Sequence, residues 1–302
     1  MAAKEVGIVG LGKMGKNIAL NMLKHGYRVV AHNRSRAPLD EVIKAGAEEA
    51  VSFSDFKAKL GKKRIVWVML PAGTVTDNAF SDLSNVLEKD DIVIDGSNSM
   101  YKDSARRTEQ MKGKGITVLD AGCSGGPSGA LNGMSIMVGG DKAAFSECEQ
   151  LFKDLSVANG LLYTGPSGSG HFVKMVHNAI EYGMMESIAE GFELMKSGPY
   201  KELQLADIAK LWNNGSVIRG YLIDLTEKGL RGDGELAGFN PQVEDKGEGR
   251  YAVAAAVEYG VSFNAITEAL YVRFSSRNGY MFGNRLLSAM RHGFGGHEAA
   301  KK

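Results

Sequence analysis

The chain has 302 residues, 44% of them hydrophobic, with a formal net charge of +1 at pH 7. This length allows two domains with cores, and the balanced charge excludes a strongly basic surface that would attract nucleic acid. No apolar run approaches the roughly 20 residues that span a bilayer, and the first residues do not form a secretory signal. Only Cys123 and Cys148 occur, so we expect no disulfide framework and a cytoplasmic protein.

The first predicted element is a βαβ unit. An apolar strand begins at Val6, a helix follows the glycines, and a second strand covers 28–32. Gly10, Gly12 and Gly15 match the G-x-G-x-x-G pattern. In this pattern the first glycine makes a tight turn, the second lets pyrophosphate approach, and the third packs the helix on the strand. The unit therefore predicts a dinucleotide-binding domain.

The end of the second strand bears on cofactor preference. NAD sites usually carry an acidic residue there, whereas this chain has Asn33, Arg34 and Ser35. Because Arg34 can pair with a 2′-phosphate, we predict NADP in preference to NAD, although an ordinary surface arginine is the alternative. The expected cofactor-binding residues are Gly10, Leu11, Gly12, Lys13, Met14, Gly15, Asn33, Arg34, Ser35, Leu70, Pro71, Ala72 and Asn98.

Further strands are predicted at 65–69, 92–95 and 117–120, with helices at 54–60 and 102–112. This alternation favours an α/β Rossmann-type, doubly wound sheet whose carboxyl-end loops bind ligand. Such loops are expected at 69–74 and 95–98, and Ser124, Gly125 and Gly126 follow the strand at 117–120.

The second half of the chain has mainly helical periodicity. After short strands at 135–138 and 161–164, the GPSGSG segment at 165–170 precedes a long helix from about His171 to Lys196. We therefore predict a nucleotide-binding domain at 1–164 and an all-helical domain at 165–302, with a ligand cleft between them.

Polar residues form one stripe on the long helix. Lys174, His177, Asn178 and Glu181 are spaced i, i+3, i+4 and i+7, so they should line one wall. A base, a ring, an amide and a carboxylate together suit proton transfer, although a solvated face is the plainer alternative. A metal site at His177 and Glu181 would lack further ligands, and none is predicted.

These motifs together resemble the 6-phosphogluconate dehydrogenases, a family within the β-hydroxyacid dehydrogenases. The resemblance rests on GIVGLGKMGKNIALNM, HNRS, DGSN, CSGG, GHFVKMVHNAIEYG, DKGEGR, VRFSS and RHGFGGH, in the family's order. It implies oxidative decarboxylation of 6-phosphogluconate to ribulose 5-phosphate and CO₂, with reduction of NADP⁺, in the pentose phosphate pathway.

The resemblance also implies residue roles. Lys174 would be the general base and Glu181 the general acid. The implied substrate contacts are Asn98, Ser124, Gly125, Gly126, His177 and Asn178, with Tyr182, Lys246 and Arg273 at the phosphate. Arg291 and His297 would enter the site of a neighbouring subunit, which implies a homo-oligomer, a dimer or a tetramer.

The chain departs from the long form of the family in length and at two positions. Glu248 replaces a phosphate-binding threonine, where an acid would repel phosphate unless it turns away, and Pro127 replaces a glutamate. Two other functions stay open. One is a dehydrogenase for an unphosphorylated acid such as 3-hydroxyisobutyrate, and the other is a non-catalytic NADP-binding redox sensor.

Overall fold

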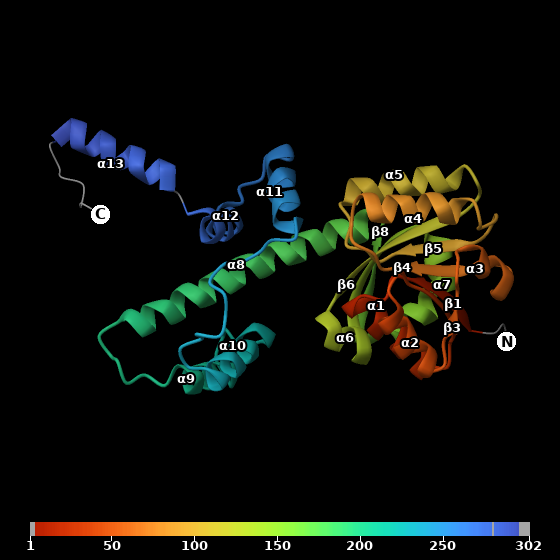
Figure 1. Cartoon of the computed structure of the whole chain (residues 1–302), viewed down its shortest axis with the longest axis horizontal. Helices are drawn as coiled ribbons and strands as arrows, with labels where there is room; N and C mark the ends of the chain where they lie inside the picture. Colours follow the sequence, from red (N-terminus) through yellow and green to blue (C-terminus); the bar gives the residue numbers. More distant parts are fainter. Residues whose placement is uncertain (1–3, 280, 296–302) are drawn as a thin grey trace. The chain divides into compact units, whose positions relative to one another are not determined.

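The computed structural model describes residues 4–279 and 281–295 (Figure 1). The chain divides into two compact units, Met1–His177 and Asn178–Lys302. This division falls inside a helix. The boundary at 164/165 that the sequence predicts between two domains stays a prediction. None of the helices in the described residues is long and apolar enough to cross a membrane.

The first unit is built on one sheet of eight strands in the order β3-β2-β1-β4-β5-β6-β7-β8. All neighbouring strands pair in parallel except β6 and β7, which are antiparallel. The order reverses between β1 and β4, the topological switch point at which doubly wound sheets bind ligands. The strands are β1 Glu5–Val9, β2 Arg28–His32, β3 Glu48–Glu49, β4 Ile65–Val68, β5 Ile92–Asp95, β6 Thr117–Ser124, β7 Met134–Gly140 and β8 Ser156–Gly165.

Helices cover both faces of this sheet (Figure 1). Two apolar clusters form the core, one including Ile8, Ile18 and Trp67, the other including Phe56 and Phe80. Because both faces are covered, β5 is an uninterrupted buried run, as expected of an interior parallel strand. The helices are α1 Lys13–Lys24, α2 Arg36–Lys44, α3 Ser54–Lys59, α4 Thr74–Ser84, α5 Tyr101–Lys112, α6 Gly126–Asn132 and α7 Lys142–Asp154.

The remaining helices confirm the predicted α/β-then-helical architecture. Helix α8, Ser169–Ser197, begins in the first unit and extends beyond the predicted 171–196 by a residue or two at each end. In the second unit, α9 and α10 pack on α8 residues around Phe192, and Phe192 and Trp212 make an edge contact. These helices are α9 Leu205–Asn213, α10 Tyr221–Gly232, α11 Glu248–Glu258, α12 Asn264–Asn278 and α13 Met281–Gly295.

Candidate active site

The glycine turn after β1 has the geometry that a dinucleotide requires. Gly10 has φ +92°, and an added Cβ there would strike the carbonyl of Met69. A Cβ at Gly15 would strike the carbonyl of Gly10, so this glycine allows α1 to pack against the turn. Gly12 is exposed, has nothing within 4 Å of its Cβ position, and precedes a first helical turn without acidic residues. A pyrophosphate can therefore approach these backbone amides.

Asn33 closes this turn from the end of β2. Its Oδ1 accepts a hydrogen bond from the Leu11 amide at 2.9 Å, and its Nδ2 donates to the Ser35 carbonyl at 2.8 Å. Among the described residues, Arg34 has no ion-pair partner, and its side chain is exposed. Arg36, by contrast, pairs with Asp40 and Glu49.

The loops after β4 and β5 carry the other expected cofactor contacts. Pro71 and Ala72 are exposed, and Leu70 is half-buried; the Pro71 carbonyl accepts a hydrogen bond from Thr76 Oγ1 at 2.8 Å. Asn98 has φ +56°, a left-handed conformation that is uncommon for a residue with a Cβ. Lys13 is exposed and Met14 is half-buried against the core.

Lys174 is the buried centre of the first polar cluster. Its residue is 7% exposed, so the plainer alternative of a solvated face is wrong at this position. Lys174 Nζ lies 3.4 Å from His177 Nδ1, and His177 Nε2 lies 3.1 Å from Ser124 Oγ. The ring of His177 therefore connects the lysine to the serine, and its tautomer decides which neighbour donates.

The sheet beneath Lys174 has no room for a side chain at Gly122. A Cβ at Gly122 would strike Lys174 Cβ and lie 2.9 Å from the Gly170 carbonyl. Gly170 is equally confined, because its own Cβ would lie 2.8 Å from the Gly139 amide. These glycines bring the backbone of α8 close to β6 and β7, and they set the depth of the lysine.

Asp120 fixes the start of the same helix. Its carboxylate accepts hydrogen bonds from the amides of Gly168, at 2.6 Å, and His171, at 2.8 Å. An acid at a helix N-terminus satisfies free amides and interacts favourably with the helix dipole. His171 is itself buried, and its Nδ1 lies 2.7 Å from Ser104 Oγ. Sequence analysis missed Asp120 and Gly122 as site-forming residues.

Cys123 lies next to this cluster but is not activated. Burial raises the pKa of its thiol to about 12, although the charge of Lys174 acts in the opposite direction. At neutral pH the thiol is therefore protonated, which argues against a nucleophilic role.

A second polar cluster lies in the second unit around Tyr182. The Arg273 guanidinium stacks on the Tyr182 ring, with Cζ 3.7 Å from the ring centroid. Arg273 is 8% exposed, its Nη1 donates to the Glu244 carbonyl at 2.9 Å, and its buried Nε has no partner among the described residues. The pKa of Tyr182 is raised, mainly by burial and then by the charge of Glu248.

The loop that carries Lys246 is anchored to α12. Asp245 accepts hydrogen bonds from Arg250 Nε at 2.8 Å and Arg277 Nη2 at 2.7 Å, and its side chain is 2% exposed. The hydrogen bond from Arg250 is the main cause that holds the pKa of Asp245 far below its usual range. Lys246 is exposed and immediately precedes the Gly247 cap of α11.

The two departures from the family pattern each have a structural partner. Glu248 Oε1 accepts a long hydrogen bond, 3.4 Å, from Asn178 Nδ2, so the acid is directed to α8. The Pro127 carbonyl accepts from Asn17 Nδ2 at 2.8 Å, which ties α6 to the nucleotide helix α1. Gly125 and Gly126, before Pro127, have positive φ.

For three predicted site residues, the described part of the structure shows no side-chain contact that tests their role. Glu181 is half-buried on α8. Arg291 is a residue of helix α13, and His297 lies outside the described residues. Within 4–279 and 281–295, no group of His, Cys, Asp or Glu is arranged to hold a metal ion.

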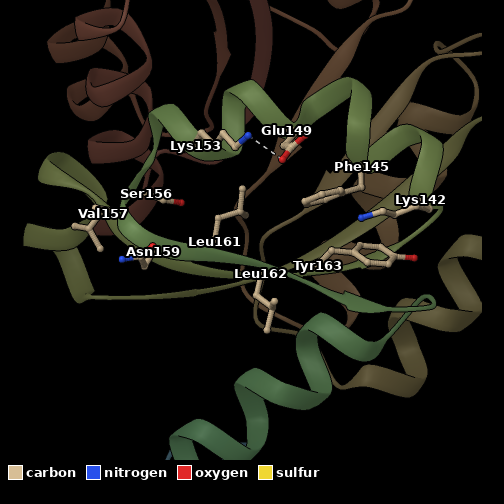
Figure 2. Close-up of a pocket in the computed structure, with 11 residues that line it drawn as sticks. Lys142, Phe145, Glu149, Lys153, Ser156, Val157, Asn159, Leu161, Leu162 and Tyr163 are labelled. Atoms are coloured by element: carbon tan, nitrogen blue, oxygen red, sulfur yellow. Dashed lines mark ion pairs between the residues drawn. The ribbon is translucent and has the colours of Figure 1, made fainter.

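A hollow of about 620 Å³ lies along α7 and β8, and none of the residues that line it is a predicted site residue (Figure 2). There, Lys142 Nζ lies 4.6 Å from the centroid of Phe145 and 4.2 Å from that of Tyr163. Leu162, on the same edge strand, is 63% exposed. The hollow is open, and its lining lacks the titratable cluster that surrounds Lys174, so we place the candidate active site at Lys174.

The nucleotide-binding sheet and the helix-borne lysine cluster define an NAD(P)-binding dehydrogenase. Residues 5–165 match the model of the NAD-binding domain of 6-phosphogluconate dehydrogenase, and residues 170–281 match the model of its C-terminal domain. The chain therefore belongs to the 6-phosphogluconate dehydrogenase family.

Individual relatives agree in family but differ in cofactor. A Bacillus subtilis protein that is provisionally named a 6-phosphogluconate dehydrogenase is 42% identical to this chain. The match covers 99% of this chain and the whole length of the relative. A Haloferax volcanii NAD⁺-dependent, decarboxylating 6-phosphogluconate dehydrogenase is 41% identical over 99% of both chains. The Plasmodium falciparum 6-phosphogluconate dehydrogenase, solved with NADP⁺ and with 6-phosphogluconate, superposes with a TM-score of 0.83 at 30% identity, covering 99% of this chain and 67% of that one.

Proposed function

We propose that the protein oxidises and decarboxylates 6-phosphogluconate to ribulose 5-phosphate and CO₂, with NADP⁺ as the preferred acceptor. The observation that carries the proposal is the buried Lys174, 3.4 Å from the His177 ring, which in turn contacts Ser124. Family membership and the length shared with the Haloferax enzyme support the same reaction.

The lysine can serve both bond-breaking steps. As a neutral amine, Lys174 takes the proton from the substrate 3-hydroxyl. A dinucleotide held by the β1 and β2 loops would supply the acceptor for the hydride that leaves C3. As the resulting ammonium, it donates to the ketone oxygen, so electrons from the departing carboxylate can flow into the ketone. His177, in contact with Nζ, orients the lysine, and Ser124 holds the other ring nitrogen.

Loss of CO₂ leaves an enediol that needs a proton at C1. Glu181 follows Lys174 by about two turns of α8 and is the acid that we assign to this step. Asn178 and the glycines at 125 and 126 would contact the hydroxyl and carboxylate groups of the substrate, together with Asn98.

The Tyr182 cluster supplies the groups for a phosphate. Arg273 is preorganised by its stacking on Tyr182 and its bond to a backbone carbonyl, and Lys246 adds a cation at the start of α11. Because Glu248 interacts with Asn178, it need not face the phosphate. This cation pair favours a phosphorylated acid over 3-hydroxyisobutyrate.

NADP⁺ preference is supported by the exposed guanidinium of Arg34 and by the amide at position 33. In an Arg34→Ala variant, the Michaelis constant for NADP⁺ should rise while that for NAD⁺ stays nearly unchanged. A wild-type preference for NAD⁺, as in the name of the Haloferax relative, would overturn this part of the proposal.

We also propose a cytoplasmic homo-oligomer in which Arg291 and His297 reach a neighbouring site. The free cysteines suit a reducing compartment, and apolar side chains such as Val217 and Val257 are exposed in the second unit. Light scattering after size-exclusion chromatography gives the subunit number, and a monomer with full activity would contradict the shared site.

The test of the reaction is to mix the protein with 6-phosphogluconate and either NADP⁺ or NAD⁺, and to follow nicotinamide reduction and CO₂ release. Unphosphorylated gluconate is the control. Reduction without CO₂ would indicate a simple dehydrogenase, and reduction of neither cofactor would remove the proposed substrate.

A further inference from the structure

A fully buried arginine lies behind the loops at the carboxyl ends of β4 and β5. Arg107, on α5, is 0% exposed. Its Nη1 donates to Asp95 Oδ2 at 2.9 Å and to Ser99 Oγ at 2.6 Å, and its Nε donates to Asp77 Oδ1 at 2.9 Å. One guanidinium therefore joins α5 to the end of β5, to the loop that follows it, and to the first turn of α4.

The bonds around Asp95 constrain the loop that contains Asn98. Asp95 Oδ1 accepts hydrogen bonds from the amide and the hydroxyl of Ser97, and the hydroxyls of Ser97 and Ser99 are 2.7 Å apart. Both neighbours of Asn98 are thus tied into one buried network. A left-handed residue persists only where its surroundings enforce it, and this network provides the enforcement at φ +56°.

Asp77 extends the network to the other loop. The Asp77 amide donates to the Gly73 carbonyl at 3.0 Å, and Thr76, one residue earlier, fixes the Pro71 carbonyl. Burial acts to raise the pKa of Asp77, but hydrogen bonds from Arg106 and Arg107 outweigh it, and the pKa lies below its ordinary value. The carboxylate is therefore charged at neutral pH and holds the arginine.

We propose that Arg107 is a positioning residue that locks the β4–α4 and β5–α5 loops together, and thereby holds the nicotinamide half of the dinucleotide. Arg107 is buried beneath these loops and acts through Ser99, Asp95 and Asp77. In a Rossmann-type domain the pyrophosphate and the adenosine ribose are expected at the β1 and β2 loops, which this network does not include. The inference rests on the dinucleotide site of the proposed function, and not on the identity of the substrate.

The chain contains a matched control at the opposite end of the same strands. Arg64, directly before β4, forms a buried ion pair with Asp91, directly before β5, at 3.1 Å. Its side chain is 7% exposed and that of Asp91 is 1% exposed. Arg64→Lys and Arg107→Lys therefore make the same chemical change in similar buried ion pairs, at the amino and carboxyl ends of the strands respectively.

The test compares binding of NADP⁺ with binding of 2′,5′-ADP, which lacks the nicotinamide half, by titration calorimetry of the full chain. In Arg107→Lys the Kd for NADP⁺ should rise on the order of tenfold or more, because bonds to a charged group are lost, while the Kd for 2′,5′-ADP stays within about twofold. In Arg64→Lys neither Kd should change beyond about twofold, although thermal stability falls.

Ser99→Ala provides a second variant that leaves both charges paired. The Kd for NADP⁺ should rise about fivefold and the Kd for 2′,5′-ADP should stay unchanged, because the substitution removes one hydrogen bond of the network. Equal weakening of both ligands, or no weakening in either network variant, would overturn the inference alone. If the wild-type chain bound neither NADP⁺ nor NAD⁺, the cofactor assignment would fail together with the inference.

Discussion

Replacing Gly122 with alanine tests whether close packing sets the position of Lys174. The new Cβ would strike Lys174 Cβ and lie 2.9 Å from the Gly170 carbonyl and 3.1 Å from Lys174 Cγ. Ordinary contacts to carbon begin near 3.4 Å, so α8 must move away from β6 by several tenths of an ångström or more. We expect the free energy of unfolding to fall by about 1–3 kcal/mol, as is typical of overpacking. We also expect kcat to fall by up to about 100-fold, the cost of misplacing a reacting group by about 1 Å.

The assay pairs steady-state kinetics with urea unfolding. Gly129→Ala is the matched control, because the nearest atom to its Cβ position is 3.7 Å away and it lies in a helix with ordinary φ. That variant should keep both kcat and stability. If Gly122→Ala lost stability but kept its kcat at a temperature where it is folded, the packing would be structural only, and the link to Lys174 would be refuted.

Three further predictions concern named side chains. Lys174→Ala should lower kcat by about 10²–10⁴-fold while isothermal titration shows nearly unchanged binding of 6-phosphogluconate; turnover close to wild type would remove Lys174 as the base. Arg273→Ala should raise the apparent Michaelis constant for 6-phosphogluconate much more than it lowers kcat, because an arginine pairs with phosphate in the ground state too, and equal loss of kcat would argue against this role. Asp245→Asn should destabilise the protein at pH 7. The folded-state pKa of Asp245 is depressed, so its stabilisation is complete above the unfolded pKa of about 3.9 and is lost as pH falls below that value. Denaturant unfolding at pH 7 and pH 3 should therefore show a smaller difference between wild type and variant at pH 3.

The fold was largely predictable because its signals are local. Gly10 has a backbone conformation that glycine adopts most easily, and Gly15 is needed for the close approach of α1 to the turn. The spacing of Lys174 and His177 follows from helical periodicity. These features involve residues close together in sequence, so a pattern is enough to identify them.

The supporting contacts are different in kind. Asp120 binds the amide of Gly168 from 48 positions away, and Gly122 is required only because α8 packs on that part of β6. No sequence pattern predicts the buried position of Arg107, because an arginine in a polar helix is normally a surface residue. Such roles arise from tertiary packing, so no sequence motif predicts them.

The side-chain amide of Asn33 has a consequence for redesign. Aspartate has nearly the same shape and would keep the oxygen that accepts from the Leu11 amide. It would lose the nitrogen that donates to the Ser35 carbonyl, and would place two acceptors 2.8 Å apart. An exchange of a single atom therefore strains the corner between β2 and α2, so altering the cofactor at this position calls for a coordinated change in the 33–35 turn.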